Sequence, residues 1–131
     1  MSNIIEKINK SQLKSDRNGF NVGDTICVHT IVKEGEKERI QKFTGIVMGR
    51  RGSDINAAFT VRRISYGEGV ERVFPLHSPR IAKITVESAG SVRRSKLNYL
   101  RNRTGKAALA VKDKEREKPD AKPEAAAPAA A

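Results

Sequence analysis

Residues 24–49 read DTICVHTIVKEGEKERIQKFTGIVMG and contain two runs rich in Val, Ile, Thr and Phe, at 24–33 and 39–49, on either side of the charged segment EGEKE. Apolar and polar residues alternate along both runs, which is the pattern of half-buried β-strands. The segment between the runs is too short for a helical crossover. The stretch therefore predicts two antiparallel strands joined as a hairpin.

The same pattern continues in three further runs, AAFTVRRISYG at 57–67, VERVFPLH at 70–77 and RIAKITVES at 80–88. Because the connections are short, all five strands are expected to be antiparallel, and such closely spaced strands favour a small SH3-like or OB-like barrel with closed edges. Gly45 lies inside a strand, which indicates a bulge or a corner where the sheet bends. The residues expected inside the barrel are Phe43, Val47, Phe59, Val61, Phe74 and Ile84.

The N-terminal segment has the pattern of a short helix. Ile4, Ile5 and Ile8 recur at helical spacing. Asn3 and Glu6 have the separation of a capping box, with Asn in place of Ser or Thr. These residues predict a short amphipathic helix that is too small to be stable alone.

Positive charge is concentrated after the last strand. The 131-residue chain has 26 Lys and Arg against 15 Asp and Glu, a net charge of +11. The stretch SVRRSKLNYLRNRTGK at 91–106 contains six cations and no carboxylate. Leu97 and Leu100 would share one side of a helix here, but the cations point in most other directions, so no wide apolar face remains. Like charges three residues apart, such as Arg93 and Lys96, repel each other in an isolated helix. We therefore expect a polyanion to neutralise the cations of this stretch.

The last part of the chain, KDKEREKPDAKPEAAAPAAA, has balanced charge, three prolines and almost nothing apolar larger than Ala. Such a composition predicts disorder. We therefore expect four parts: an N-terminal helix at 1–18, a β-barrel at 19–89, a basic helical extension at 90–111 and a disordered tail at 112–131.

Other features indicate a cytosolic protein. A single cysteine excludes an internal disulfide and suits a reducing compartment. The N-terminal sequence has neither the apolar core of a signal peptide nor the acid-free, Arg-rich pattern of a transit peptide, and no apolar run approaches the ~20 residues that span a bilayer. Binding to an anionic membrane is disfavoured because no helix has large apolar residues opposite the cations.

The sequence contains little that points to catalysis. Cys27 and His29 share one face of a strand, which is compatible with a nucleophile and base or with half of a metal site. There is no second cysteine, the other histidine is His77, and Asp24 is expected on the opposite face. A buried thiol and a histidine in the wall of the sheet are the simpler interpretation. We therefore predict no enzyme, no cofactor and no metal site.

The basic residues point instead to RNA. Arginine outnumbers lysine among them, and its planar guanidinium binds phosphate through two hydrogen bonds and stacks on bases. Arg62 and Arg63 are neighbours in one strand and point to opposite faces, so one of them must pair or snorkel. Tyr66 and Tyr99 are available for base stacking. The candidate RNA-binding cations are Arg50, Arg51, Arg62, Arg63, Arg72, Arg80, Arg93, Arg94, Lys96, Arg101, Arg103 and Lys106.

Several segments resemble a known family. FNVGDTICVH, GEKERIQKFTGIV, FTVRRISYGEGVER, GVERVFPLHSPRI and GSVRRSKLNYLRNRTGKAA, which fall in order between about residues 3 and 108, resemble the bacterial large-subunit ribosomal protein nineteen family. The resemblance implies an SH3-like barrel with helical extensions, bound to large-subunit rRNA at the face that meets the small subunit. It also implies a neighbouring large-subunit protein, the one numbered fourteen, bridges to small-subunit rRNA near the aminoacyl-tRNA side, and no catalytic residues or cofactor.

Carried over by position, the resemblance places His77, Ser78 and Arg80 of the turn FPLHSP near the RNA. It also places Tyr99 there, whereas relatives often have an aromatic residue where this chain has Asn98. Two alternatives stay open. One is a free SH3-like RNA-binding factor in transcription or translation, and the other is an RNA-processing enzyme that uses Cys27 and His29.

Overall fold

The computed structural model describes residues 3–17 and 19–112, apart from the side chain of Lys106. Helix α1 (Ile4–Ser11) is followed by β1 (Thr25–Glu34), β2 (Lys37–Arg51), β3 (Ala58–Ser65), β4 (Glu68–Pro75) and β5 (Ile81–Ser88). Each strand lies where the sequence predicted one. Four short 3-10 turns complete the structure, η1 (Ser15–Arg17), η2 (Asp54–Asn56), η3 (Asn98–Asn102) and η4 (Gly105–Ala107). Apart from Lys112, the tail predicted to be disordered lies outside the described residues.

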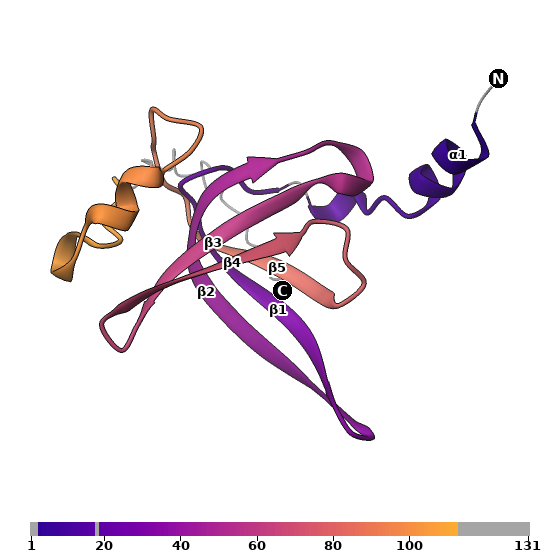
Figure 1. Ribbon diagram of the computed structural model, residues 1–131, viewed down its shortest axis with the longest axis horizontal. Coiled ribbons are helices and arrows are strands. Elements are labelled where there is room, and N and C mark those ends of the chain that lie inside the picture. The colour runs from indigo at the N-terminus through magenta and orange to yellow at the C-terminus, as the bar shows by residue number, and fades with distance from the viewer. Residues whose placement is uncertain (1–2, 18, 113–131) are drawn as a thin grey trace, which may run out of the picture.

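The five strands form one antiparallel sheet in the order β4-β3-β2-β1-β5 (Figure 1). Among the described residues no ladder joins β4 to β5, so the sheet is open and the predicted closure of its edges is not confirmed. The sheet is nevertheless curled, because Phe74 of β4 and Ile81 of β5 belong to the same core. The β1–β2 hairpin is paired to its tip, Glu34 with Lys37, and projects from the rest of the sheet (Figure 1).

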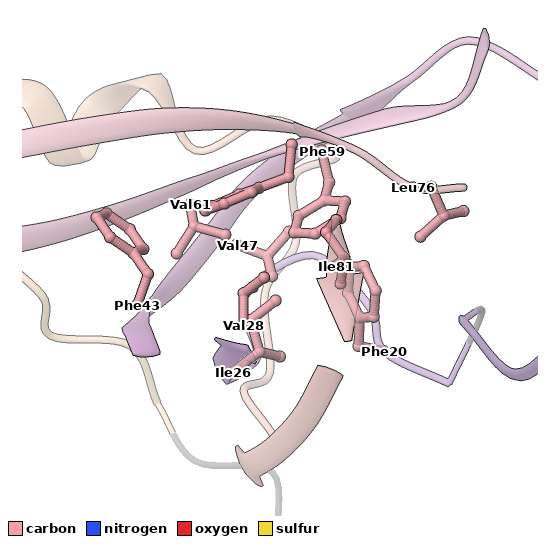
Figure 2. Close-up of a cluster of buried hydrophobic side chains, with 10 residues drawn as sticks. Phe20, Ile26, Val28, Phe43, Val47, Phe59, Val61, Leu76 and Ile81 are labelled. Atoms are coloured by element: carbon pink, nitrogen blue, oxygen red, sulfur yellow. The ribbon is translucent and has the colours of Figure 1, made fainter. Parts of the chain in front are cut away.

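The core fills the inside of the curl (Figure 2). Phe59 contacts Phe20 edge to face, with ring centroids 4.9 Å apart, and stacks on Phe74 at 5.5 Å. Five of the six predicted interior residues are buried, and Ile84 lies partly buried at the margin. The other core residues are Phe20, Ile26, Val28, Leu76 and Ile81.

Gly45 allows β2 and β3 to approach each other closely. A Cβ atom at this position would overlap the carbonyl oxygen of Arg62 in β3. The bulge itself lies further along β2, where Met48 is the extra residue between the Val47–Val61 and Gly49–Thr60 pairs. A bulge bends its strand and increases the local twist. The bend and the glycine thus occupy separate places in β2.

Helix α1 has the predicted N-cap, in which the side chain of Asn3 accepts a hydrogen bond from the backbone N–H of Ile5 at 3.4 Å. No residue of α1 is buried. The helix therefore does not contribute to the core. Across residues 3–17 and 19–112, no helix has the length and apolar character needed to cross a membrane.

Candidate nucleic-acid interface

The basic segment after β5, residues 90–112, is called the extension from here on. A second apolar cluster docks it on the outer face of the sheet, where Leu97 and Leu100 are completely buried against Ile46 and Met48 of β2. The backbone N–H of Leu97 also donates to the carbonyl oxygen of Met48 at 2.8 Å. The leucine side of the extension is thus packed against the protein itself.

The extension is not an α-helix. It contains two 3-10 turns, η3 and η4, so the predicted helical form is not confirmed. These turns are too short to distribute side chains evenly around an axis, and the chain folds around the two leucines. Val92, Leu109 and Val111 pack partly buried against the same cluster, and Ala108 is buried as well. The described cations of the extension that are exposed are Arg93, Arg94, Lys96, Arg101, Arg103 and Lys112.

Glu71 of β4 ties the extension to the sheet. It accepts hydrogen bonds from Arg101 Nε and Nη2, both at 2.9 Å, and from Arg62 Nη1 at 2.7 Å. These hydrogen bonds, those of Arg101 above all, hold the pKa of the Glu71 carboxyl below its ordinary value. Arg62 is only 8% exposed, so in this structure it positions Glu71 from beneath the surface. The expectation that either Arg62 or Arg63 must find a partner is confirmed by the pairing of Arg62 with Glu71. The guanidinium carbon of Arg63 lies 4.6 Å from the ring centroid of Phe43.

Replacing Glu71 with Gln is expected to destabilise the fold by about 2 kcal/mol at pH 7, because charged hydrogen bonds are lost and the buried Arg62 loses its counter-charge. The folded-state pKa of Glu71 lies below its ordinary value of 4.5, so its stabilising effect is present above that pH and is lost as the pH falls through the folded value. Urea unfolding of both proteins at neutral and acidic pH should therefore show a difference that shrinks in acid.

The matched control for this experiment is Glu68→Gln. Glu68 is an exposed residue of the same strand, and it forms no ion pair within the described residues. The control should leave stability within ~0.5 kcal/mol of the wild type. An equal effect of the two substitutions would contradict the proposed role of Glu71.

Tyr99 holds two of the exposed arginines. The guanidinium carbon of Arg103 lies 4.7 Å from the centre of its ring, and that of Arg94 lies 5.8 Å away. A cation over an aromatic ring is attracted by the electron-rich face. Tyr99, expected as a platform for a base, is therefore engaged with guanidinium groups in this structure. It restricts where these two cations lie.

Two shallow grooves connect the extension with other predicted site residues. The first, of about 170 Å³, is lined in part by Arg50, Arg51, Lys96 and Arg101. The second, of about 430 Å³, shares Arg50 and reaches His77. The structure thus brings the end of β2 next to the extension and links it to the turn FPLHSP.

The turn FPLHSP is held by the segment that precedes β1. Arg17 is buried, and its guanidinium donates to the carbonyl oxygens of Leu76, Ser78 and Ile81. His77 Nδ1 accepts a hydrogen bond from the backbone N–H of Lys14 at 3.0 Å. Neutral His77 therefore carries its proton on Nε2, where it can donate to a phosphate. Arg17 is a single arginine that lies outside every strand, so the sequence does not predict its structural role.

The remaining predicted cations lie elsewhere. Arg72 and Arg80 line a third groove, of about 740 Å³, beside the β1–β2 hairpin. The guanidinium of Arg72 lies 5.0 Å from the ring centroid of Phe74. These two arginines are not part of the surface formed by the extension and the end of β2. The side chain of Lys106 lies outside the described part of the structure.

Cys27 and His29 are placed as the simpler interpretation predicts. Both are buried side chains of β1, and Cys27 is a free thiol. Cys27 is paired with Thr44 on one side and Thr85 on the other, neither of which can act as a general base. Within the described residues, no three His, Cys, Asp or Glu side chains are grouped as metal ligands would be.

Comparison with known proteins agrees with the resemblance seen in the sequence. The family model described as ribosomal protein L19 matches residues 3–114. The chain is 57% identical over 111 residues to the large ribosomal subunit protein bL19 of Alkaliphilus metalliredigens (strain QYMF). The aligned region covers 85% of this chain and 95% of that protein. Proteins of this kind are structural and not enzymatic, which confirms the prediction that the chain is no enzyme. The chain belongs to the ribosomal protein L19 family.

Proposed function

We propose that the chain is a structural constituent of the large ribosomal subunit in the cytoplasm, and that it binds large-subunit rRNA through the extension and the adjoining end of β2. One observation carries this proposal. Arg93, Arg94, Lys96 and Arg103 are exposed, and within the described residues none of them has a carboxylate partner. They belong to a segment that the buried Leu97 and Leu100 hold in place.

The proposed mechanism is neutralisation of closely spaced phosphates by cations at fixed positions. RNA helices repel one another when they pack, and bound Lys and Arg side chains relieve this repulsion while condensed counter-ions are released. The sheet holds the cations through Ile46, Met48 and Glu71, so less conformational entropy is lost on binding than for a flexible basic segment. Recognition of this kind depends on the shape of the RNA more than on its sequence.

The finer parts of the proposal rest on the family resemblance. We place the protein at the face of the large subunit that meets the small subunit, where it contributes to bridges with small-subunit rRNA near the aminoacyl-tRNA side. We also class the curled sheet as SH3-like. The tip of the β1–β2 hairpin pairs its charges, Lys33 with Glu38 at 3.4 Å and Arg39 with Glu34 at 2.8 Å. Such a balanced surface suits a protein neighbour, and we propose the large-subunit protein numbered fourteen.

Sedimentation of tagged protein with separated ribosomal subunits tests the proposed function. The full-length chain is expected to sediment with the large subunit at one copy per particle and to stay there after a high-salt wash. The alternative, a free RNA-binding factor, would be removed by the wash. Sedimentation with neither subunit would contradict the proposal.

A further inference from the structure

The outer face of β5, β1 and β2 has a row of basic side chains outside the proposed interface. His29 of β1 is paired with Lys42 of β2 on one side and with Lys83 of β5 on the other. His29 follows the core residue Val28, so the row lies on the face turned away from the core. Neighbouring strands are about 4.8 Å apart, which places the backbones of the two lysines about 10 Å from each other.

Among residues 3–17 and 19–112, no carboxylate balances this row. Lys42 and Lys83 are exposed and form no ion pair within the part of the chain that the structure describes. The other charged groups on this face are Glu87, further along β5, and the Lys33–Glu38 pair near the hairpin tip. Lys42 and Lys83 lie on either side of β1, and at a separation of about 10 Å their like charges repel each other. A bound anion would therefore stabilise this row.

His29 responds to its two neighbours. Burial, Lys83 and Lys42 all lower the pKa of its imidazole, in that order of effect. An anion between the lysines would offset the last two causes and raise the pKa. Because the chain has only two histidines, His29 can be followed as a single resonance beside that of His77.

The neighbouring row is uncharged and leads toward the extension. It consists of Thr44, Cys27 and Thr85, which are paired across the three strands. Beyond Thr44, β2 continues to Ile46, which the extension covers. At about 3.3 Å per residue, Lys42 lies about 13 Å from Ile46. The basic row is thus close enough to the extension for one RNA backbone to reach both.

We propose that Lys42 and Lys83, on either side of the buried His29, bind a second stretch of RNA sugar–phosphate backbone and continue the surface that the extension begins. The inference rests on the proposed rRNA-binding function and adds a second contact to it. Lysine binds phosphate as a point charge, without the directional fork of arginine, so this contact is expected to be independent of base sequence. The threonines beside it are small enough to let the backbone approach the sheet.

The first test measures binding to a large-subunit rRNA transcript after the double substitution Lys42→Gln and Lys83→Gln. The affinity at about 0.15 M salt is expected to fall about ten-fold, and the slope of log K against log salt to become smaller by about 1.5. The matched control, Lys33→Gln with Lys37→Gln, removes the same charge from the exposed hairpin tip. Equal losses for both variants would show only a general charge effect and would overturn the inference.

The second test follows the imidazole resonances of the full chain by NMR during a pH titration, with His77→Gln for assignment. The pKa of His29 should rise in the Lys42→Gln, Lys83→Gln variant without RNA, which checks the geometry, and should rise in the wild type when the transcript binds. An unchanged His29 pKa in an RNA complex would overturn the inference while leaving the proposed function intact. The same titration is repeated with inorganic phosphate in place of the transcript, at the same total concentration of phosphate groups. If the pKa of His29 rises equally there, the inference is also overturned, because the row then binds any phosphate and has no preference for the RNA backbone. Failure of the wild type to bind the transcript would instead overturn the proposed function.

Discussion

A variant in which Arg93, Arg94, Lys96 and Arg103 are all replaced by Gln is expected to bind large-subunit rRNA on the order of 100-fold more weakly than the wild type at about 0.15 M salt. This loss corresponds to about 2.8 kcal/mol of binding free energy. The four side chains are exposed, and no described carboxylate neutralises them. Arg101 is kept because its guanidinium holds Glu71. Filter binding with a large-subunit rRNA transcript measures the effect.

A second variant with the same change in net charge serves as the control. It replaces four exposed lysines away from the extension, Lys7, Lys10, Lys33 and Lys37, with Gln. Because general attraction to RNA depends on net charge, this control should lose some affinity, but less than about ten-fold. If the two variants lose equal affinity, the extension has no special role in binding.

Replacing both Leu97 and Leu100 with Ala is expected to release the extension from the sheet. Truncating a buried leucine typically costs 2 to 5 kcal/mol, so the pair should weaken docking by about 4 kcal/mol or more. The two leucines belong to a cluster separate from the main core. The sheet should therefore stay folded while the backbone N–H at position 97, which donates to Met48, loses protection from hydrogen exchange. Binding to rRNA should weaken as well, because the cations lose their fixed positions.

The control for the leucine variant is Ile40→Ala with Val73→Ala. These residues are 58% and 48% exposed, so their truncation removes apolar atoms without opening a cavity. Stability, exchange protection and RNA affinity should stay close to those of the wild type. If the leucine variant keeps both the protection at position 97 and its RNA affinity, then docking on β2 is not what positions the cations.

The strands could be predicted because apolar residues alternate in them and the connections are short. The sheet order and the burial of Phe20 and Leu76, which lie outside the strands, depend on tertiary packing that local patterns do not record. The pairing of Arg62 with Glu71 could have been found, since the tight turn at Tyr66 and Gly67 sets the register of β3 and β4. Arg62 is predicted to contact RNA from its charge alone, and in the structure its guanidinium donates to Glu71.

The extension was predicted only in part. Its charges indicate an anionic partner, but an ideal helix has no wide apolar face here, so helical periodicity does not predict the docking of Leu97 and Leu100. The signal for their partner was present in the continuous apolar run Ile46, Val47 and Met48, because a strand that is apolar on both faces is covered on both faces. No such signal existed for Arg17, whose partners are backbone carbonyl oxygens.

The salt dependence of rRNA binding tests most directly whether the cations of the extension neutralise phosphates. The slope of log K against log salt is measured for the wild type and for the variant lacking Arg93, Arg94, Lys96 and Arg103. Six neutralised phosphates predict a slope of about −5 for the wild type, and loss of four should reduce it to about −2. A wild-type slope near zero, or equal slopes for both proteins, would contradict the account.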